Sequence, residues 1–320
     1  MHALHFGRTS SGVARCSIAL AALALSACAT SPSAPSGEQS VQITFDARVG
    51  AKPLKCGESY AGVGSSKATM MLQDFRIYVS KVRLISADGS EVPLLLTPDN
   101  QWQNDKVTLL DFENATGSCN GNAPMNNAVR GTAPAGHYTG VVFEIGVPQE
   151  MNHQDPTLAG VPLNYSGLTW PWRFGYKFTT IDLETANKAG GGAAMASAQP
   201  PAGGMKNGMH GMGGMAATGF SIHLGSTDCG AGSPTTPPSS PCATSNRPTF
   251  RLDGFSPAKQ NVVLDLGALL AGNDVTVNAP NSASGCMSGA DDGDCVAIME
   301  RFGLTFRGKS SAGQTFVKAS

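Results

Sequence analysis

The sequence predicts an all-β fold: an antiparallel β-sandwich of the immunoglobulin-like kind, with short helices, long loop insertions and disulfide staples. Apolar residues, mostly β-branched or aromatic, recur at every second position in 41–45, 75–79 and 141–145. This period is that of a half-buried strand, whose side chains alternate between core and solvent. Gly, Asn, Asp and Pro separate such segments at short intervals, which is typical of a sandwich.

The other strands are expected from the same alternation, or from short apolar runs bounded by turn residues. They lie at 92–96, 107–112, 174–183, 220–224, 249–255, 261–266 and 304–317. Helical signal is confined to two short pieces, 267–271 and 294–302. Because long helices do not alternate with strands, a doubly wound nucleotide-binding fold is disfavoured. We expect a single domain over residues 41–320.

The N-terminus has the pattern of a lipoprotein signal peptide. Arg8 and Arg15 precede an apolar stretch at 18–25, and small residues lie just before Cys28. Cleavage there would remove residues 1–27 and leave Cys28 lipid-modified. An ordinary secretory signal is the alternative, and both predict export. Ala29 favours an outer-membrane, periplasm-facing protein, and residues 28–40, rich in Ser and Pro, are expected to form a flexible tether.

The cysteines predict disulfide bonds. Eight are present, and six remain once Cys16 and Cys28 are assigned to the signal peptide and the anchor. An even number in an oxidising compartment is typical of disulfides. Several connectivities are open, but the short separations favour two pairs and leave a third: Cys229–Cys242, Cys286–Cys295 and Cys56–Cys119. A thiolate metal site is the alternative, although the sequence contains no Cys-x-x-Cys.

Composition and missing motifs disfavour several functions. The formal net charge is -1, only 14% of the residues are charged, and Lys and Arg do not cluster, so nucleic acid is not expected as a partner. The sequence has no Cys-x-x-Cys-His haem attachment motif. It also has no Gly-x-Ser-x-Gly elbow, which disfavours a serine hydrolase.

One long insertion interrupts the strand pattern at residues 188–217, where Gly, Ala and Met dominate. We expect a flexible loop there. Thioether sulfur is soft and matches Cu(I), so this loop offers secondary copper-collecting candidates: Met205, Met209, His210, Met212 and Met215. A low-complexity loop with incidental methionines is the alternative. A second loop, rich in Pro and Ser, lies at 233–241.

Four motifs follow one another along the chain. They are Gly146-Val147-Pro148 with Asn152-His153, then Trp170-Pro171-Trp172 with Gly175-Tyr176-Lys177-Phe178, then His223 to Cys229, and finally Cys286-Met287-Ser288-Gly289 with Cys295. From about Val41 to the C-terminus, the chain with these motifs resembles the MbnP family, also called the metallo-mystery-pair four-Cys proteins. The four-Cys name would cover the two later cysteine pairs.

The resemblance implies a protein of copper homeostasis that is the substrate of an enzyme rather than an enzyme itself. In such proteins the first tryptophan of Trp-x-Trp, here Trp170, is oxidised to kynurenine by a diheme partner. That partner is a MauG-like cytochrome c peroxidase-type enzyme (MbnH-like). Unmodified indole is only a hydrogen-bond donor, whereas kynurenine offers an amine and a ketone. The copper site would therefore form only after the partner has acted.

His153, His223 and Trp170 as kynurenine are the expected ligands of a single copper ion, as Cu(I). Neutral imidazole suits copper, and loops at one end of a sandwich could bring these residues together. Taken alone, each histidine could simply be hydrogen-bonded and each tryptophan a core residue. Two alternative functions are a mononuclear copper redox enzyme, and a structural or adhesive sandwich without metal.

Overall fold

A computed structural model describes residues 37–171, 174–186, 219–230 and 236–320. The expected signal peptide and lipidation site at Cys28 lie outside the described residues, as do most of the tether, Trp172 and the whole 188–217 insertion. None of the helices in the described part of the chain has the length and apolar character needed to cross a membrane.

The first of two sheets is built around β1 (Glu38–Val49), so regular structure begins inside the segment expected to be a tether. Its strand order is β15 (Val317–Ala319), β13 (Val262–Asp265), β1, β8 (Ala128–Pro134) and β6 (Leu95–Leu96), and β2 (Lys52–Pro53) also pairs with β1.

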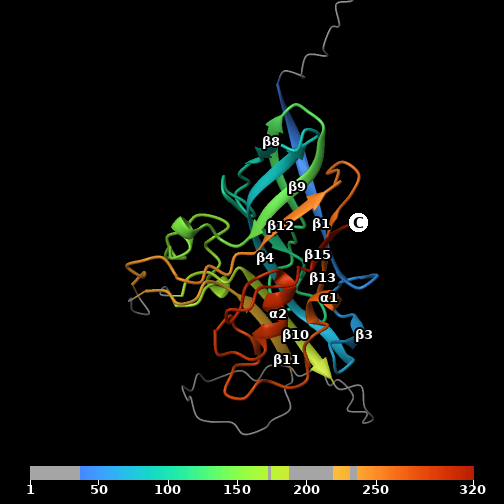
Figure 1. Ribbon diagram of the computed structural model, residues 1–320, viewed down its shortest axis with the longest axis vertical. Coiled ribbons are helices and arrows are strands. Elements are labelled where there is room, and N and C mark those ends of the chain that lie inside the picture. The colour runs from blue at the N-terminus through green and yellow to red at the C-terminus, as the bar shows by residue number, and fades with distance from the viewer. Residues whose placement is uncertain (1–36, 172–173, 187–218, 231–235) are drawn as a thin grey trace, which may run out of the picture. The chain divides into compact units, whose positions relative to one another are not determined.

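The second sheet is built around the long strand β4 (Ala68–Ser86) (Figure 1). Its order is β12 (Thr249–Asp253), β9 (Tyr138–Ile145), β4, β10 (Thr179–Ala186), β11 (Gly219–Leu224) and β14 (Gly285–Cys286). Three more strands pair with β4: β3 (Ser59–Val63), β5 (Glu91–Pro93) and β7 (Val107–Asp111).

The two sheets share one hydrophobic core, and the predicted all-β sandwich is confirmed. Alternate residues of β1, such as Ile43 and Phe45, are buried. The Phe45 ring meets Phe143 of the other sheet edge to face, with the ring centroids 5.4 Å apart. Pairing is antiparallel except at two places, where β1 runs parallel to β13 and β11 runs parallel to β14.

The helices are short. They are α1 (Leu266–Leu270), α2 (Cys295–Phe302) and two single 3-10 turns, η1 (Gln149–Met151) and η2 (Ser166–Leu168). Both α-helices lie where the sequence predicted them. Helix α2 buries Ile298, Met299 and Phe302 and ends at Gly303, whose left-handed conformation (φ 83°) is favourable for glycine.

Two strand predictions were wrong in extent. The strand expected at 174–183 begins only at Thr179, because residues 174–178 belong to a turn and an irregular segment that carries Trp170. The strand expected at 304–317 is an irregular loop, and only 317–319 pairs with β13. Sequence analysis missed β3 and β8, in which small and polar residues break the apolar alternation.

Three disulfides join the pairs Cys56–Cys119, Cys229–Cys242 and Cys286–Cys295, as expected from the sequence. Each would stabilise the fold by roughly 2 to 5 kcal/mol. Cys286–Cys295 ties β14 to α2, and Cys229–Cys242 closes the loop that follows β11.

Candidate metal centre

The Trp170 segment is a tight turn whose ends are hydrogen-bonded. The backbone N–H of Trp170 donates to the carbonyl of Gly175 (3.0 Å), and Thr169 forms a bridge with Tyr176. Gly175 has φ +78°, and a Cβ there would be 2.5 Å from the Asn152 carbonyl oxygen. Glycine is therefore required both for the turn and for the close approach of Asn152.

Asn152 anchors His153 beside this turn. Asn152 is fully buried, and its backbone carbonyl accepts a hydrogen bond from the Tyr176 N–H (3.2 Å). The half-buried His153 places Nε2 3.2 Å from the Asn152 amide Nδ2 and 3.3 Å from Cys242 Sγ. The His153 imidazole thus lies against the Cys229–Cys242 disulfide, and the preceding residue, Asn152, contacts the Trp170 turn.

The end of β11 brings His223 to the same region. Residues 220, 222 and 224 face the core, and His223 lies on the other face. Gly225 follows Leu224, the last residue of β11, and is buried. A Cβ at Gly225 would overlap Cζ3 of the Trp170 indole. The Trp170 ring therefore covers the chain two residues beyond His223.

His223 is oriented by a carboxylate on the neighbouring strand. Its Nε2 donates to Asp182 Oδ1 of β10 at 2.8 Å, and the register pairs Asp182 with Ser221 and Thr180 with His223. Burial would raise the pKa of Asp182, but the hydrogen bond and charge of His223 outweigh burial and lower it. Asp182 is therefore ionised at neutral pH, and its carboxylate accepts the hydrogen bond from His223 Nε2.

Ser288 holds the backbone of this strand end. Its Oγ donates to the His223 carbonyl (3.0 Å) and accepts from the Gly225 N–H (3.0 Å). Ser288 is buried and follows β14, which pairs with β11 and carries Cys286 of the Cys286–Cys295 disulfide. The late cysteine motif thus supports the strand that presents His223.

These residues fit a copper ion. A histidine that donates its second ring N–H to a carboxylate is the usual arrangement around a bound metal, and Asp182 supplies that arrangement for His223. The Trp170 ring lies on the same strand end. Conversion of its indole to an aromatic amine and a ketone would place new donor atoms beside the two histidine-bearing segments.

A second group of potential donors is present but is not a thiolate site. His153 Nε2 or Nδ1 and the sulfurs of Cys229 and Cys242 lie within 4.8 Å of one another. The two sulfurs are bonded to each other in a disulfide. Because the thiolate is the metal-binding form of cysteine, this group does not hold a metal while the disulfide is intact.

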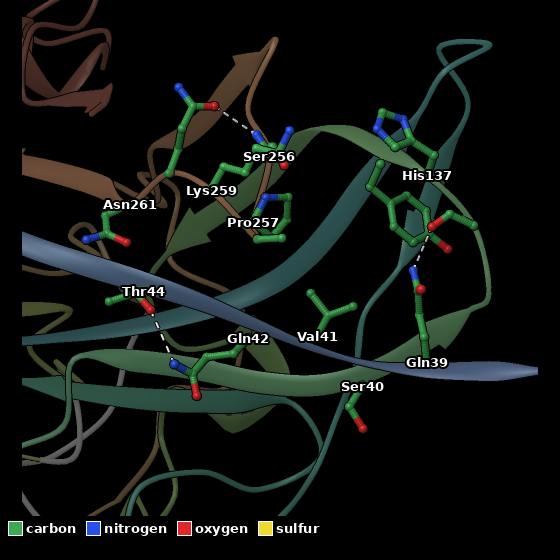
Figure 2. A pocket seen from close by; sticks show the side chains of 14 residues that line it. Gln39, Ser40, Val41, Gln42, Thr44, His137, Ser256, Pro257, Lys259 and Asn261 are labelled. Atoms are coloured by element: carbon green, nitrogen blue, oxygen red, sulfur yellow. Dashed lines mark hydrogen bonds between the residues drawn. The ribbon is translucent and has the colours of Figure 1, made fainter.

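A polar groove of about 600 Å³ lies elsewhere, between β1, the turn before β9 and residues 256–261 (Figure 2). Figure 2 shows Gln39 donating to the Gly136 carbonyl (2.9 Å) and Gln42 donating to Thr44 (3.3 Å). His137 lines this groove. None of the groove's lining residues is His153, Trp170 or His223.

The structure thus brings together the three segments that carry His153, Trp170 and His223. The loops that follow β9 and β11 lie side by side (Figure 1), joined by the His153–Cys242 contact. The secondary candidates Met205, Met209, His210, Met212 and Met215 lie outside the described residues. Sequence analysis missed Asp182 and the role of Gly225. Asp182 could have been suspected only as an outward-facing acid in an apolar strand.

Comparison with known proteins agrees with this architecture. No curated protein matches the chain. Among solved structures, MbnP from Methylosinus trichosporium is similar, with 29% sequence identity and a TM-score of 0.71. The match covers 89% of this chain and 99% of that one. A model of the MbnP family matches residues 38–288, which include His153, Trp170, His223 and Ser288. Because these residues span well over half of the chain, the protein belongs to the MbnP family.

Proposed function

We propose that this member of a copper-related family is an exported, lipid-anchored copper-binding protein of copper homeostasis. Its site consists of His153, His223 and residue 170, and it becomes competent only after Trp170 has been converted to kynurenine. The protein is thus the substrate of a partner enzyme rather than a catalyst. The observation that carries the proposal is the packing of the Trp170 ring on Gly225, beside the Asp182-oriented His223.

The proposed oxidation breaks the C2–C3 bond of the indole. Two equivalents of peroxide remove four electrons, C2 and C3 each receive one oxygen atom, and two waters are released. Hydrolysis then releases C2 as formate and leaves an aryl ketone with a free aromatic amine. A MauG-like diheme enzyme would supply the oxidising equivalents. The sequence of this chain carries no haem attachment motif of its own.

The amine and ketone of kynurenine would complete a site that indole cannot form, because the indole nitrogen is only a donor. His153 and His223 would contribute imidazole nitrogen, a ligand that suits copper. Copper bound there would be held as Cu(I) for storage or transfer. Asp182 and Asn152 would act as the residues that orient the two imidazoles.

The cellular location follows from the N-terminal sequence. The Arg residues, the apolar stretch and Cys28 support cleavage before Cys28 and attachment to a lipid. An outer-membrane, periplasm-facing position would give the protein access to an exported diheme partner. The Met-rich insertion would collect copper through soft thioether ligands.

Ligand variants test the proposed site. The protein would be produced together with its diheme partner, and its copper would be measured after dialysis. The wild type should retain one copper, and His153→Ala, His223→Ala and Trp170→Phe should each lose it. His137→Ala is the matched control, because His137 lies in the groove of Figure 2, and it should retain copper. Full retention in all three ligand variants would refute the site.

A further inference from the structure

The Cys229–Cys242 disulfide lies directly against the His153 imidazole. Cys242 Sγ is 3.3 Å from His153 Nε2, and a ring nitrogen of His153 and both sulfurs lie within 4.8 Å of one another. Among the described residues, no other group of three or more His, Cys, Asp or Glu donors is as compact. One imidazole therefore lies against two sulfurs that are joined by a disulfide bond, which can be reduced.

We infer that Cys229, Cys242 and His153 form a redox-gated site for Cu(I). With the disulfide closed, the site binds no metal. With the disulfide open, two thiolates and one imidazole surround a soft cation, and soft thiolate ligands select Cu(I). This site shares His153 with the one under Proposed function, but it uses neither residue 170 nor His223, and its other two ligands are the cysteine sulfurs.

The chemistry requires an external dithiol as reductant. A dithiol transfers two electrons and two protons to the Cys229–Cys242 bond, becomes a disulfide itself, and leaves two protein thiols. Cu(I) then displaces the two thiol protons and binds two thiolates and the His153 nitrogen. Copper is not oxidised or reduced in either step. An external disulfide would reverse the step: it takes two electrons from the two thiolates, becomes a dithiol, re-forms the Cys229–Cys242 bond and releases the ion.

The surrounding backbone would keep the two sulfurs together when their bond is open. Thr227 and Thr244 exchange backbone hydrogen bonds of 2.9 and 3.2 Å, and Ala243 N–H donates to the Asp228 carbonyl at 3.0 Å. The Thr244 hydroxyl donates to the Asp228 carboxylate at 2.8 Å. This short ladder adjoins the disulfide, with residues 227–228 just before Cys229 and residues 243–244 just after Cys242, so reduction need not separate the two segments.

The exposure of the cysteines favours reduction at this position. Cys229 is half-buried, whereas Cys286 and Cys295 are fully buried. Thiol–disulfide exchange requires that the attacking thiolate reach a sulfur, so the core disulfide is shielded in the folded protein. Cys56 is also half-buried, and the Cys56–Cys119 pair therefore serves as the matched control.

The test uses full-length protein produced without the diheme partner, so that Trp170 remains unmodified. The protein is treated with dithiothreitol, desalted under nitrogen and titrated with Cu(I) in competition with a Cu(I) chelator. Free thiols are counted before and after the metal is added, and circular dichroism reports the fold. Variants are Cys229→Ser with Cys242→Ser, Cys56→Ser with Cys119→Ser, His153→Ala and His137→Ala.

Reduced wild type should bind one more Cu(I) than the untreated protein and should protect two thiols. The Cys229/Cys242 double variant should lose this binding, and His153→Ala should weaken it by at least about tenfold. The Cys56/Cys119 and His137→Ala variants should retain it, because His137 lies in the groove of Figure 2. Equal Cu(I) binding before and after reduction, binding indifferent to His153→Ala, or unfolding on reduction would each overturn the inference. None of these results depends on Trp170 oxidation, so they leave the proposed function untouched.

Discussion

Asp182 and His223 lie on neighbouring strands, β10 and β11, and meet through a 2.8 Å hydrogen bond between Asp182 Oδ1 and His223 Nε2. This contact leaves Nδ1 as the nitrogen of His223 that could bind a metal. The Trp170 ring packs on Gly225, two residues further along the same chain.

Replacement of Asp182 by alanine should weaken copper binding without loss of the fold. The His223 ring would lose the acceptor that fixes its tautomer, and such supporting contacts are typically worth about 10- to 100-fold in metal affinity. Chelator competition on partner-treated protein would measure the change. Glu184→Ala, two residues along the outward side of the same strand, should leave the affinity unchanged. Equal effects of both variants would argue against an orienting role.

Gly225→Ala should prevent modification of Trp170. The added methyl group would occupy the space of the Trp170 ring, and the displaced indole should no longer be oxidised to kynurenine. Peptide mapping after incubation with the partner would show unchanged tryptophan. Gly160→Ala is the control, because a Cβ at Gly160 has no neighbour within 4 Å. Normal conversion in Gly225→Ala would mean that this packing is not required.

Ser288→Ala should lower both stability and copper affinity. It removes the hydroxyl shared by the His223 carbonyl and the Gly225 N–H, and leaving buried backbone groups unpaired costs about 1 to 3 kcal/mol. Ser284→Ala removes a hydroxyl bonded to the Gly219 carbonyl at the opposite end of β11. That control should affect stability alone. Urea unfolding would measure stability, and chelator competition would measure copper affinity. Unchanged copper affinity in Ser288→Ala would show that the hydrogen bonds of Ser288 to His223 and Gly225 do not support the copper site.

The free energy of unfolding should fall as pH rises from about 5 to 7. Asp111 is buried, its Oδ1 accepts from the Glu113 N–H, and its Oδ2 has no hydrogen-bond partner among the described residues. Burial raises the pKa of Asp111 to about 7, and the Glu113 charge adds to the rise. The unfolded chain, with an Asp pKa of about 3.9, loses this proton at a lower pH than the folded state does. Between these two pKa values a rise in pH therefore favours the unfolded state.

In Asp111→Asn, the fall in the free energy of unfolding between pH 5 and 8 should be smaller than in the wild type by on the order of 2 kcal/mol. Part of the slope should persist, because burial also raises the pKa of Asp74 to about 6 in spite of its ion pair with Arg76. Urea unfolding at several pH values would measure the slope. Asp105→Asn, at an exposed position, should keep the wild-type slope. If the free energy of unfolding of Asp111→Asn falls with pH as steeply as that of the wild type, the Asp111 carboxyl is already ionised in the folded state.

Strands with clean alternation could be predicted from the sequence, because burial on one face imposes a period of two. Val41, Ile43 and Phe45 show this alternation, and so do Val141, Phe143 and Ile145. Strand β8 contains Gly131 and Pro134 and was missed. The 304–317 segment contains apolar residues that pack as a loop, so apolar content alone misled the prediction there.

The motif residues His153, Trp170 and His223 were identifiable from their order along the chain, but their supporting contacts were not. Asp182 meets His223 only because β10 and β11 pair in one particular register, and register is not visible in a single sequence. Likewise, the contact between His153 and Cys242 joins residues 89 positions apart. The two short-range disulfides were easier to predict, because short separations restrict the choice of partner.

Oxidation of Trp170 to kynurenine is proposed to create the copper site. The most direct measurement is intact mass and peptide mapping of the protein produced with and without its native diheme partner, together with its copper content. The account predicts that residue 170 gains one oxygen and loses one carbon only when the partner is present, and that one tightly held copper appears only in that sample. Unmodified Trp170 and no retained copper in either sample would contradict it.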